Sequence, residues 1–305
     1  MWSLLGAQRR ALLCGCLLVA LGCEAPVERR VQYDERFERN QMDLYLPGDG
    51  AVGRPAILTV HGGAWTYFDN RSYRSIARRF ARSGYVVGNI NYRLVPDGVF
   101  PNSVHDVGCA LAYLQNHADE LGLDPTRIAV MGYSAGAHLA TLVAVEPGDP
   151  LLVPDCAEGA PMRPAAVVSG AGPTDMRGLR DADLVRRFMG GREEDIPELY
   201  ALASPVEHAS PDDPPTLFVH GRWDLFVPIE QSRTMRDLLR AEGVEANLLE
   251  LSGTGHVFNP NDDASSLGIA LSNDSPEAWA VILDSLDRHI GQPRAAPACH
   301  SDGCC

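Results

Sequence analysis

The sequence of 305 residues lacks lysine altogether, so all 26 of its basic residues are arginines. We interpret this as a composition bias of the genome, not as a functional feature. A basic run is also missing: 40 acidic residues give a formal net charge of −14, and arginines gather only in short pairs such as Arg78-Arg79. We therefore expect no nucleic-acid partner. The acidity favours solubility and disfavours anionic substrates. A hydrophobic content of 45% is ample for a core.

The N-terminal apolar run, residues 11–22, is too short to cross a bilayer as a stop-transfer helix. It follows Arg9-Arg10, and positive residues before a short apolar run are typical of a secretory signal. The run ends at Cys23, in a sequence that resembles a bacterial lipoprotein signal. We expect residues 1–22 to be a signal peptide, Cys23 to be lipidated, and 23–30 to be a linker. The protein would then be exported and anchored by lipid to a cell-envelope membrane. Simple secretion and an uncleaved anchor are the alternatives.

Few of the 8 cysteines fall inside the predicted domain. Cys109 and Cys156 are a candidate disulfide pair, which an exported protein can form. The tail, residues 292–305, holds Cys299, Cys304 and Cys305. Their spacing matches no structural zinc pattern, so we favour a disulfide-bearing or disordered tail and expect no metal site and no cofactor.

Apolar runs of strand length alternate with helical patterns over residues 31–291, which we interpret as one α/β domain. The predicted strands are 33–37, 41–46, 56–60, 85–91, 127–132, 165–169, 216–220 and 247–251, and the predicted helices are 71–83, 103–121, 135–145, 231–242 and 276–290. This alternation favours a mainly parallel eight-stranded sheet with helices on both faces. Loops at the carboxyl ends of such strands form the ligand-binding edge. Segments 146–164 and 173–214 are rich in Pro, Asp and Gly, and we predict that they form short cap-like excursions.

Residues 128–139, IAVMGYSAGAHL, place a serine between a buried strand and an Ala/Leu-rich helix. Gly132 and Gly136 flank Ser134 at two residues on either side. This arrangement predicts a tight strand-to-helix turn that exposes a strained nucleophile, and a Cβ at either glycine would collide with the element packed alongside. Ser134 is therefore the predicted nucleophile.

A serine nucleophile needs a base and an acid that orients it, and on this kind of elbow they follow in the order serine, acid, histidine. Asp224 follows the strand at 216–220, and His256 follows the strand at 247–251. We predict that these two complete the catalytic set. The competing acids Asp212 and Asp213 precede their strand and so lie at the wrong end. The competing histidines are His208, which also precedes a strand, and His289, which lies late in a helix.

The remaining histidines are predicted to be structural. His220 stands at the end of its strand, and His138 lies one turn into the helix after Ser134, where a packed core histidine is expected. His105 and His117 lie on the long helix and are predicted to be structural or solvated.

Acyl transfer also needs donors for the developing oxyanion. The loop after the strand at 56–60 reads HGGAW, and its glycines let backbone amides turn inward. We predict that the amides of Gly63 and Ala64, together with that of Ala135, form this oxyanion hole. Trp65 and Tyr133 are predicted to line the substrate pocket, with plain packing as the alternative for Trp65.

Seven motifs stand in an order that is similar to esterases of the α/β-hydrolase family. They are HGGAW (61–65), NYRLVP (91–96), FPNSVHDV (100–107), DPTRIAVMGYSAGAHLA (124–140), ELYALASPVEH (198–208), HGRWDLFVP (220–228) and GTGH (253–256). The resemblance is to the groups related to hormone-sensitive lipase and to bacterial feruloyl and acetyl-xylan esterases. It implies the α/β-hydrolase fold and a carboxylic ester hydrolase whose nucleophile, acid and base are Ser134, Asp224 and His256. Ala64 departs from the third glycine that many relatives carry.

These observations together predict a serine carboxylesterase that forms an acyl-enzyme and acts on small or medium acyl esters. An aryl formamidase or a peptidase could use the same residues, and a surface-anchored binding protein without catalysis is the alternative of another class. The expected partner is a small-molecule ester. No protein partner is predicted, and contact with a membrane is expected only through the lipid anchor.

Overall fold

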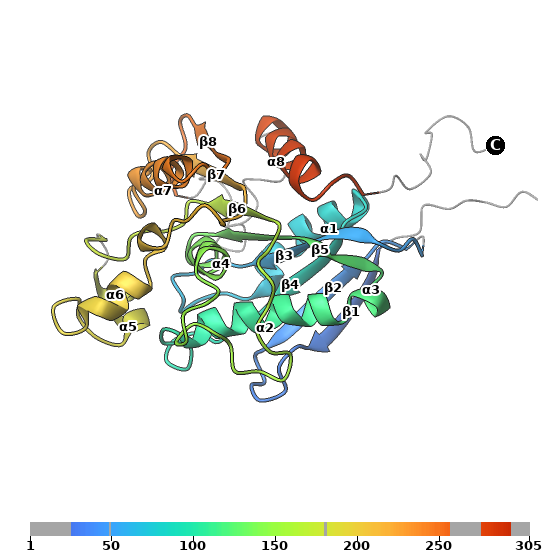
Figure 1. The fold of residues 1–305 in the computed structure, drawn as a ribbon, viewed down its shortest axis with the longest axis horizontal. Coiled ribbons are helices and arrows are strands. Elements are labelled where there is room, and N and C mark those ends of the chain that lie inside the picture. Colours follow the sequence, from blue (N-terminus) through green and yellow to red (C-terminus); the bar gives the residue numbers. More distant parts are fainter. Residues whose placement is uncertain (1–25, 49, 180–181, 257–275, 294–305) are drawn as a thin grey trace, which may run out of the picture.

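The computed structural model describes residues 26–48, 50–179, 182–256 and 276–293 (Figure 1). Eight strands form one sheet in the order β1-β2-β4-β3-β5-β6-β7-β8. β1 pairs with β2 and β2 with β4 in antiparallel fashion, while all other neighbours are parallel. The bounds are β1 Val27–Gln32, β2 Gln41–Leu46, β3 Arg54–Val60, β4 Val86–Ile90, β5 Leu123–Tyr133, β6 Ala166–Gly170, β7 Thr216–Gly221 and β8 Ala246–Leu251. The predicted mainly parallel eight-stranded sheet is confirmed.

Helices cover both faces of the sheet. The helix bounds are η1 Asn70–Tyr73, α1 Arg74–Arg82, α2 Asn102–Asn116, α3 Ala118–Leu121, α4 Ala135–Val145, α5 Ala182–Met189, α6 Pro197–Leu202, η2 Pro205–Glu207, α7 Glu230–Ala241 and α8 Pro276–His289. Ile57 of β3 belongs to a core with α1 and α8, whereas its neighbour Leu58 belongs to a core with α2 and α4 (Figure 1). This alternation explains why the central strands are apolar throughout, because both of their faces are buried.

The strand predicted at 33–37 is wrong, and β1 lies instead at Val27–Gln32, inside the predicted linker. Residues 33–40 form turns, in which the Asp34 carboxylate accepts a hydrogen bond from the amide of Arg36 at 3.1 Å. The sequence of β1, VERRVQ, lacks the apolar run expected of a buried strand, because β1 lies at the edge of the sheet, where charged residues are common. The folded domain therefore begins before residue 31.

The helix predicted at 103–121 is divided into α2 and α3 at His117. α3 ends at Leu121, and the next residue, Gly122, adopts a left-handed φ of 67°. The first turn of the helix predicted at 71–83 is the 3₁₀ helix η1, which Asp69 caps through the amide of Arg71. These differences shift element boundaries and leave the sheet order unchanged.

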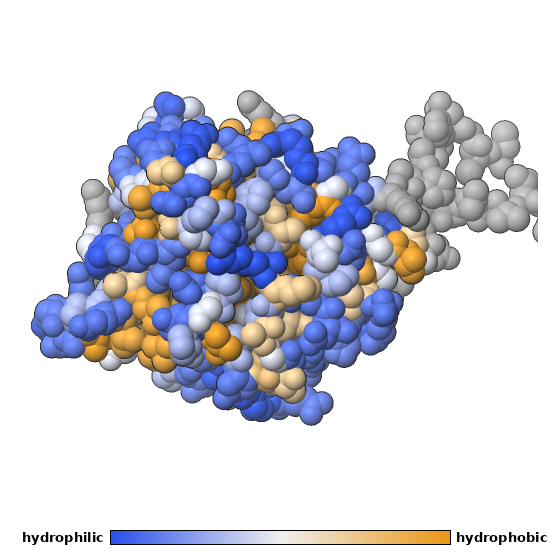
Figure 2. Space-filling model, in the orientation of Figure 1, coloured by the Kyte–Doolittle hydropathy of each residue, from blue (hydrophilic) through white to orange (hydrophobic). Residues whose placement is uncertain are grey.

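The second excursion lies on the side of the molecule where α5 and α6 stand apart from the sheet, whereas the first runs along α2, where Gln115 donates to the carbonyl oxygen of Met162 at 3.0 Å (Figure 1). The structure joins Cys109 of α2 to Cys156 of the first excursion in a disulfide, with the two Cα atoms 6.1 Å apart. The second excursion carries α5, α6 and η2. Figure 2 shows a largely hydrophilic face, on which apolar residues form several small, separate patches. The second excursion therefore has the composition of a loop but contributes the three helices α5, α6 and η2 to the fold.

Three predictions fall on residues outside the described ranges. These are the signal peptide 1–22, the lipidated Cys23, and the pairing of the cysteines of the tail. Across the described ranges, no helix combines the length and apolar character that a membrane crossing requires.

Candidate active site

Ser134 occupies the turn between β5 and α4, with φ 53° and ψ −123°. A positive φ is unfavourable for a residue with a side chain and costs about 1–3 kcal/mol. The surrounding structure holds this conformation, since the Ser134 amide donates to the carbonyl oxygen of Gly170 at 2.7 Å. The turn is the strained elbow that the sequence pattern predicts, and it lies at the carboxyl-terminal edge of the sheet.

The two flanking glycines are required by close backbone approach. A Cβ on Gly132 would lie 2.2 Å from the carbonyl oxygen of Gly136, and a Cβ on Gly136 would lie 2.2 Å from that of Val60. Both distances are far below van der Waals contact. The elbow thus packs directly against β3, which carries the loop that faces Ser134.

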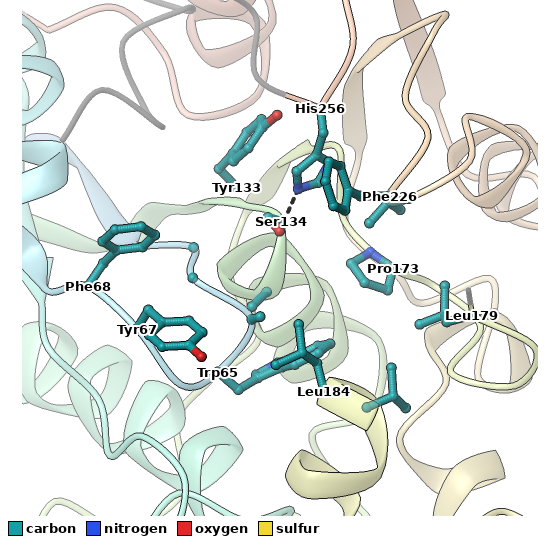
Figure 3. A pocket seen from close by; sticks show the side chains of 16 residues that line it. Trp65, Tyr67, Phe68, Tyr133, Ser134, Pro173, Leu179, Leu184, Phe226 and His256 are labelled. Atoms are coloured by element: carbon teal, nitrogen blue, oxygen red, sulfur yellow. Dashed lines mark hydrogen bonds between the residues drawn. The ribbon is translucent and has the colours of Figure 1, made fainter. Parts of the chain in front are cut away.

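His256 and Asp224 reach Ser134 from the loops after β8 and β7. The Ser134 hydroxyl donates to Nε2 of His256 at 2.9 Å (Figure 3). Nδ1 of His256 in turn donates to Oδ2 of Asp224 at 2.6 Å. The structure therefore brings all three predicted residues into one hydrogen-bonded chain. Asp213 lies elsewhere and pairs with Arg163 at 3.0 Å.

Asp224 is buried and held by four donors. Its Oδ1 accepts from the amides of Phe226 at 3.0 Å and Val227 at 2.8 Å, while its Oδ2 accepts from His256 and from Nε2 of His220 at 3.2 Å. Burial alone would raise the pKa of Asp224, but the hydrogen bonds from His220, His256 and the backbone outweigh it and lower the pKa to about 2. The carboxylate is therefore ionised at any ordinary working pH.

His220 is fully buried at the end of β7 and lies beside the acid. The hydroxyl of Ser232 donates to its Nδ1 at 2.7 Å, and its Nε2–H is shared between Asp224 and the carbonyl oxygen of Val227 at 2.9 Å. The sequence indicates a structural histidine here, but its contact with Asp224 becomes visible only in the folded chain.

The loop after β3 presents the backbone amides expected of an oxyanion hole. Ala64 and Trp65 adopt left-handed φ values of 49° and 54°, and the carbonyl oxygen of Gly63 accepts from the amide of Tyr67 at 2.8 Å. Within the part of the chain that the structure describes, the amides of Gly63, Ala64 and Ala135 donate to no other residue. They remain available to an anion that develops beside Ser134.

A cavity of about 300 Å³ opens beside Ser134 and is lined mainly by apolar and aromatic side chains. Its wall includes Trp65 and Tyr133, as the sequence predicts. Residues that the sequence analysis did not identify also line it, namely Tyr67, Phe68, Pro173, Leu179, Leu184, Val185, Phe226 and Val227 (Figure 3). These carry no sequence signal, because an apolar residue in a cavity wall has the same character as one in the core.

Among residues 26–48, 50–179, 182–256 and 276–293, no group of three or more His, Cys, Asp or Glu side chains is arranged to hold a metal ion. The groups that the described residues bring together at the site are a hydroxyl, an imidazole, a carboxylate and backbone amides.

The sheet order, the elbow and the placement of its partner loops define the α/β-hydrolase fold. A truncated carbohydrate esterase from gut microbiota matches 87% of this chain and 96% of its own, with a TM-score of 0.74 and 24% identity. Esterase Est2 from Thermogutta terrifontis, solved with propionate bound, matches 89% of this chain and 97% of its own, with a TM-score of 0.69 and 25% identity.

The BD-FAE family model matches residues 42–239. The chain therefore belongs to the BD-FAE family. A protein of Mycobacterium tuberculosis named probable carboxylic ester hydrolase LipM is 35% identical over 240 residues, which are 75% of this chain and 56% of that protein. The chain spans between 56% and 60% of the length of this relative and of esterase LipC from the same organism. The resemblance to α/β-hydrolase esterases is thus confirmed at the level of fold and family.

Proposed function

We propose that this protein is a serine hydrolase that cleaves carboxylic esters through an acyl-enzyme. The observation that carries the proposal is the hydrogen-bonded chain Ser134–His256–Asp224 at the base of an apolar cavity. The esterase names of its relatives agree with this reading.

In the first half-reaction, His256 takes the hydroxyl proton of Ser134 while Oγ bonds to the ester carbonyl carbon. The C–O bond to the alcohol then breaks, and the alcohol leaves with the proton from Nε2 of His256. In the second half-reaction, His256 removes a proton from water, whose oxygen attacks the acyl carbon, and Ser134 leaves with that proton. Asp224 holds His256 in the tautomer whose Nε2 is free to accept.

The negative charge that develops on the substrate oxygen would be held by the amides of Gly63, Ala64 and Ala135. One such donor contributes about 3 kcal/mol to the transition state. Ala64 supplies an amide as a glycine would, so the departure from the three-glycine pattern of relatives does not remove a donor.

The lining of the cavity indicates the class of ester. Among its described lining residues, no Asp, Glu or Arg side chain is present, so a charged substrate group would be buried without a counter-charge. A volume of about 300 Å³ suits a small or medium acyl group. Est2 binds propionate, which is the acid of a short acyl group. We therefore infer uncharged esters with short or medium acyl chains.

The same lining weighs against the aryl formamidase alternative, because N-formylkynurenine carries an amino-acid group with two charges. The purified protein is tested on p-nitrophenyl esters of increasing acyl length, on feruloyl esters, on N-formylkynurenine and on a peptide amide. We expect the highest kcat/KM on short or medium p-nitrophenyl esters. A preference for N-formylkynurenine would instead indicate an aryl formamidase, and a preference for the peptide amide would indicate a peptidase.

Ser134→Ala is the matched control for this panel. It should lower kcat by about 10⁴-fold or more and abolish labelling by a fluorophosphonate probe. An unlabelled wild-type protein would instead indicate a binding protein without catalysis.

We also propose that the protein is exported and anchored through Cys23. The disulfide between Cys109 and Cys156 supports an oxidising compartment, and the N-terminal signature supports the anchor. Palmitate labelling of the full chain in a bacterial host, with Cys23→Ser as the control, tests this. Equal labelling of both proteins would contradict it.

A further inference from the structure

His138 of the nucleophile helix connects three parts of the chain that are distant in sequence. Its backbone amide donates to the carbonyl oxygen of Ser134 at 3.0 Å, one turn away in α4. Its Nδ1 accepts from the indole Nε1–H of Trp65 at 3.2 Å, and its Nε2–H donates to the carbonyl oxygen of Ala203 at 2.7 Å. The side chain is fully buried.

The two partners fix the protonation state of the ring. Indole nitrogen can only donate and a carbonyl oxygen can only accept, so His138 must be neutral with its proton on Nε2. Burial lowers the pKa of His138 to about 4, against a smaller opposing effect of the hydrogen bond to Ala203. The ring therefore keeps this tautomer throughout the neutral range.

Trp65 in turn anchors the loop that carries two of the three oxyanion donors. Ala64 and Trp65 hold left-handed conformations, which a loop keeps only when its surroundings impose them. The Trp65 ring stacks on Phe188 of α5, with centroids 4.4 Å apart and planes 13° from parallel. Its carbonyl oxygen also accepts from the amide of Val95 at 2.9 Å.

The oxyanion hole is therefore made of two separate pieces. The amide of Ala135 belongs to α4, whereas those of Gly63 and Ala64 belong to the loop after β3. Donors must be placed to within about 0.5 Å to act together on one oxygen. The described hydrogen bonds include one between side chains that joins the two pieces, from Trp65 to His138.

We propose that His138 is a positioning residue that sets the two halves of the oxyanion hole relative to each other through Trp65. This inference rests on the proposed ester hydrolysis. It assigns His138 a role in transition-state stabilisation that exceeds the core packing expected from the sequence.

The test uses the full-length protein with three variants. His138→Leu removes both hydrogen bonds of the ring, and His138→Asn restores an acceptor near the position of Nδ1. Trp65→Phe removes the donor from the other side while it keeps an aromatic ring against Phe188. His105→Gln is the matched control, because Nε2 of His105 also contacts a carbonyl oxygen, that of Leu151 at 2.8 Å, away from the site.

Each variant is assayed on a p-nitrophenyl ester and on the corresponding thionoester, whose larger sulfur fits an oxyanion hole poorly. We expect His138→Leu and Trp65→Phe each to lower kcat on the oxygen ester by about tenfold or more, with KM changed far less. The ratio of the rate on the oxygen ester to the rate on the thionoester should fall in both variants. The double variant should have a kcat no lower than that of the less active single variant, because both substitutions remove the same hydrogen bond. His138→Asn should recover most of the ratio, and His105→Gln should leave it unchanged.

A lower melting temperature with an unchanged ratio and kcat in His138→Leu and Trp65→Phe would overturn the proposal, since it would mean plain packing. If His138→Leu does not fold, Trp65→Phe and His138→Asn still test the proposal, because Trp65→Phe removes the donor of the hydrogen bond and His138→Asn replaces its acceptor. Failure of the proposed function is separate from this, because wild-type protein would then hydrolyse neither ester.

Discussion

The cavity has two walls of different origin. One wall is made by loops at the carboxyl ends of β3, β5, β7 and β8, which carry Ser134, His256 and the free amides. The other is made by Leu179, Leu184 and Val185, which belong to the excursion between β6 and β7. The first is fixed by the sheet, where neighbouring strands hold each loop in place, and it carries the reactive groups. The second wall lies outside the sheet and contributes only apolar side chains. Under the proposed function, chemistry and substrate size are therefore governed by different parts of the chain.

The largest effect is expected on the sheet wall from Asp224→Asn. The amide cannot hold His256 in the tautomer that accepts the serine proton, and kcat should fall by about 10⁴-fold. The control is Asp212→Asn, which precedes β7 at the opposite end of the strand and should leave kcat unchanged. Steady-state kinetics on a p-nitrophenyl ester measures both. Comparable activity of Asp224→Asn and wild type would remove Asp224 from the mechanism.

The packing of the sheet wall is tested by Gly136→Ala. The added Cβ meets the carbonyl oxygen of Val60 at 2.2 Å, so the helix or β3 must move, and the free energy of unfolding should fall by more than about 3 kcal/mol. In Gly148→Ala, the new Cβ meets only a side-chain oxygen of Glu146 at 3.8 Å, and stability should stay within about 0.5 kcal/mol. Urea denaturation compares the two. Equal stabilities would contradict the steric account of the elbow.

Acid should weaken the fold through His61 and His138, which are both fully buried. Burial lowers the pKa of each to about 4, below the ordinary value of 6.5. As pH falls, the unfolded chain binds these protons first, so stability is lost between pH 6.5 and 4, by up to about 3 kcal/mol for each histidine.

The contribution of Asp224 to stability does not change in this window. The pKa of Asp224 is lowered from 3.8 to about 2. The stabilisation that this residue provides is therefore fully present above pH 3.8, and it is lost as pH falls from there through about 2. Urea denaturation at pH 7.5 and 4.5 measures the loss in wild type and in His138→Asn, which cannot titrate there. Between these two pH values, wild type loses stability through both His61 and His138, whereas the variant loses it through His61 alone. The loss of unfolding free energy in the variant should therefore be about half of that in wild type. An identical loss in both proteins would show that His138 titrates normally.

The smallest effect is expected on the added wall. Leu184→Trp fills part of the cavity without touching the reactive groups, so kcat/KM should fall by about tenfold for hexanoyl esters relative to acetyl esters. Arg187→Trp, on the exposed side of α5, is the matched control and should keep the wild-type preference. The chain-length series on p-nitrophenyl esters checks this. A parallel loss on every chain length would show that α5 bears on the chemistry and not only on substrate size.

The sequence predicted the sheet and the reactive residues for a common reason. A buried parallel strand is an apolar run, and the loop after it falls at a fixed edge, so Asp224 and His256 could be assigned to the edge that carries Ser134. Edge strand β1 was missed because one side of it has no neighbouring strand, and its charged residues resemble a linker.

The sequence by itself determined on which turn and loops Ser134, Asp224 and His256 lie and the order in which they occur, because strand, elbow and loop patterns are local. Tertiary structure alone decided which side chains surround them. His138 meets Trp65 and Ala203, which lie 73 and 65 positions away in the sequence, and Leu184 and Val185 of α5 line the cavity. Such contacts depend on how helices and loops pack across the sheet edge, and no local pattern specifies that packing.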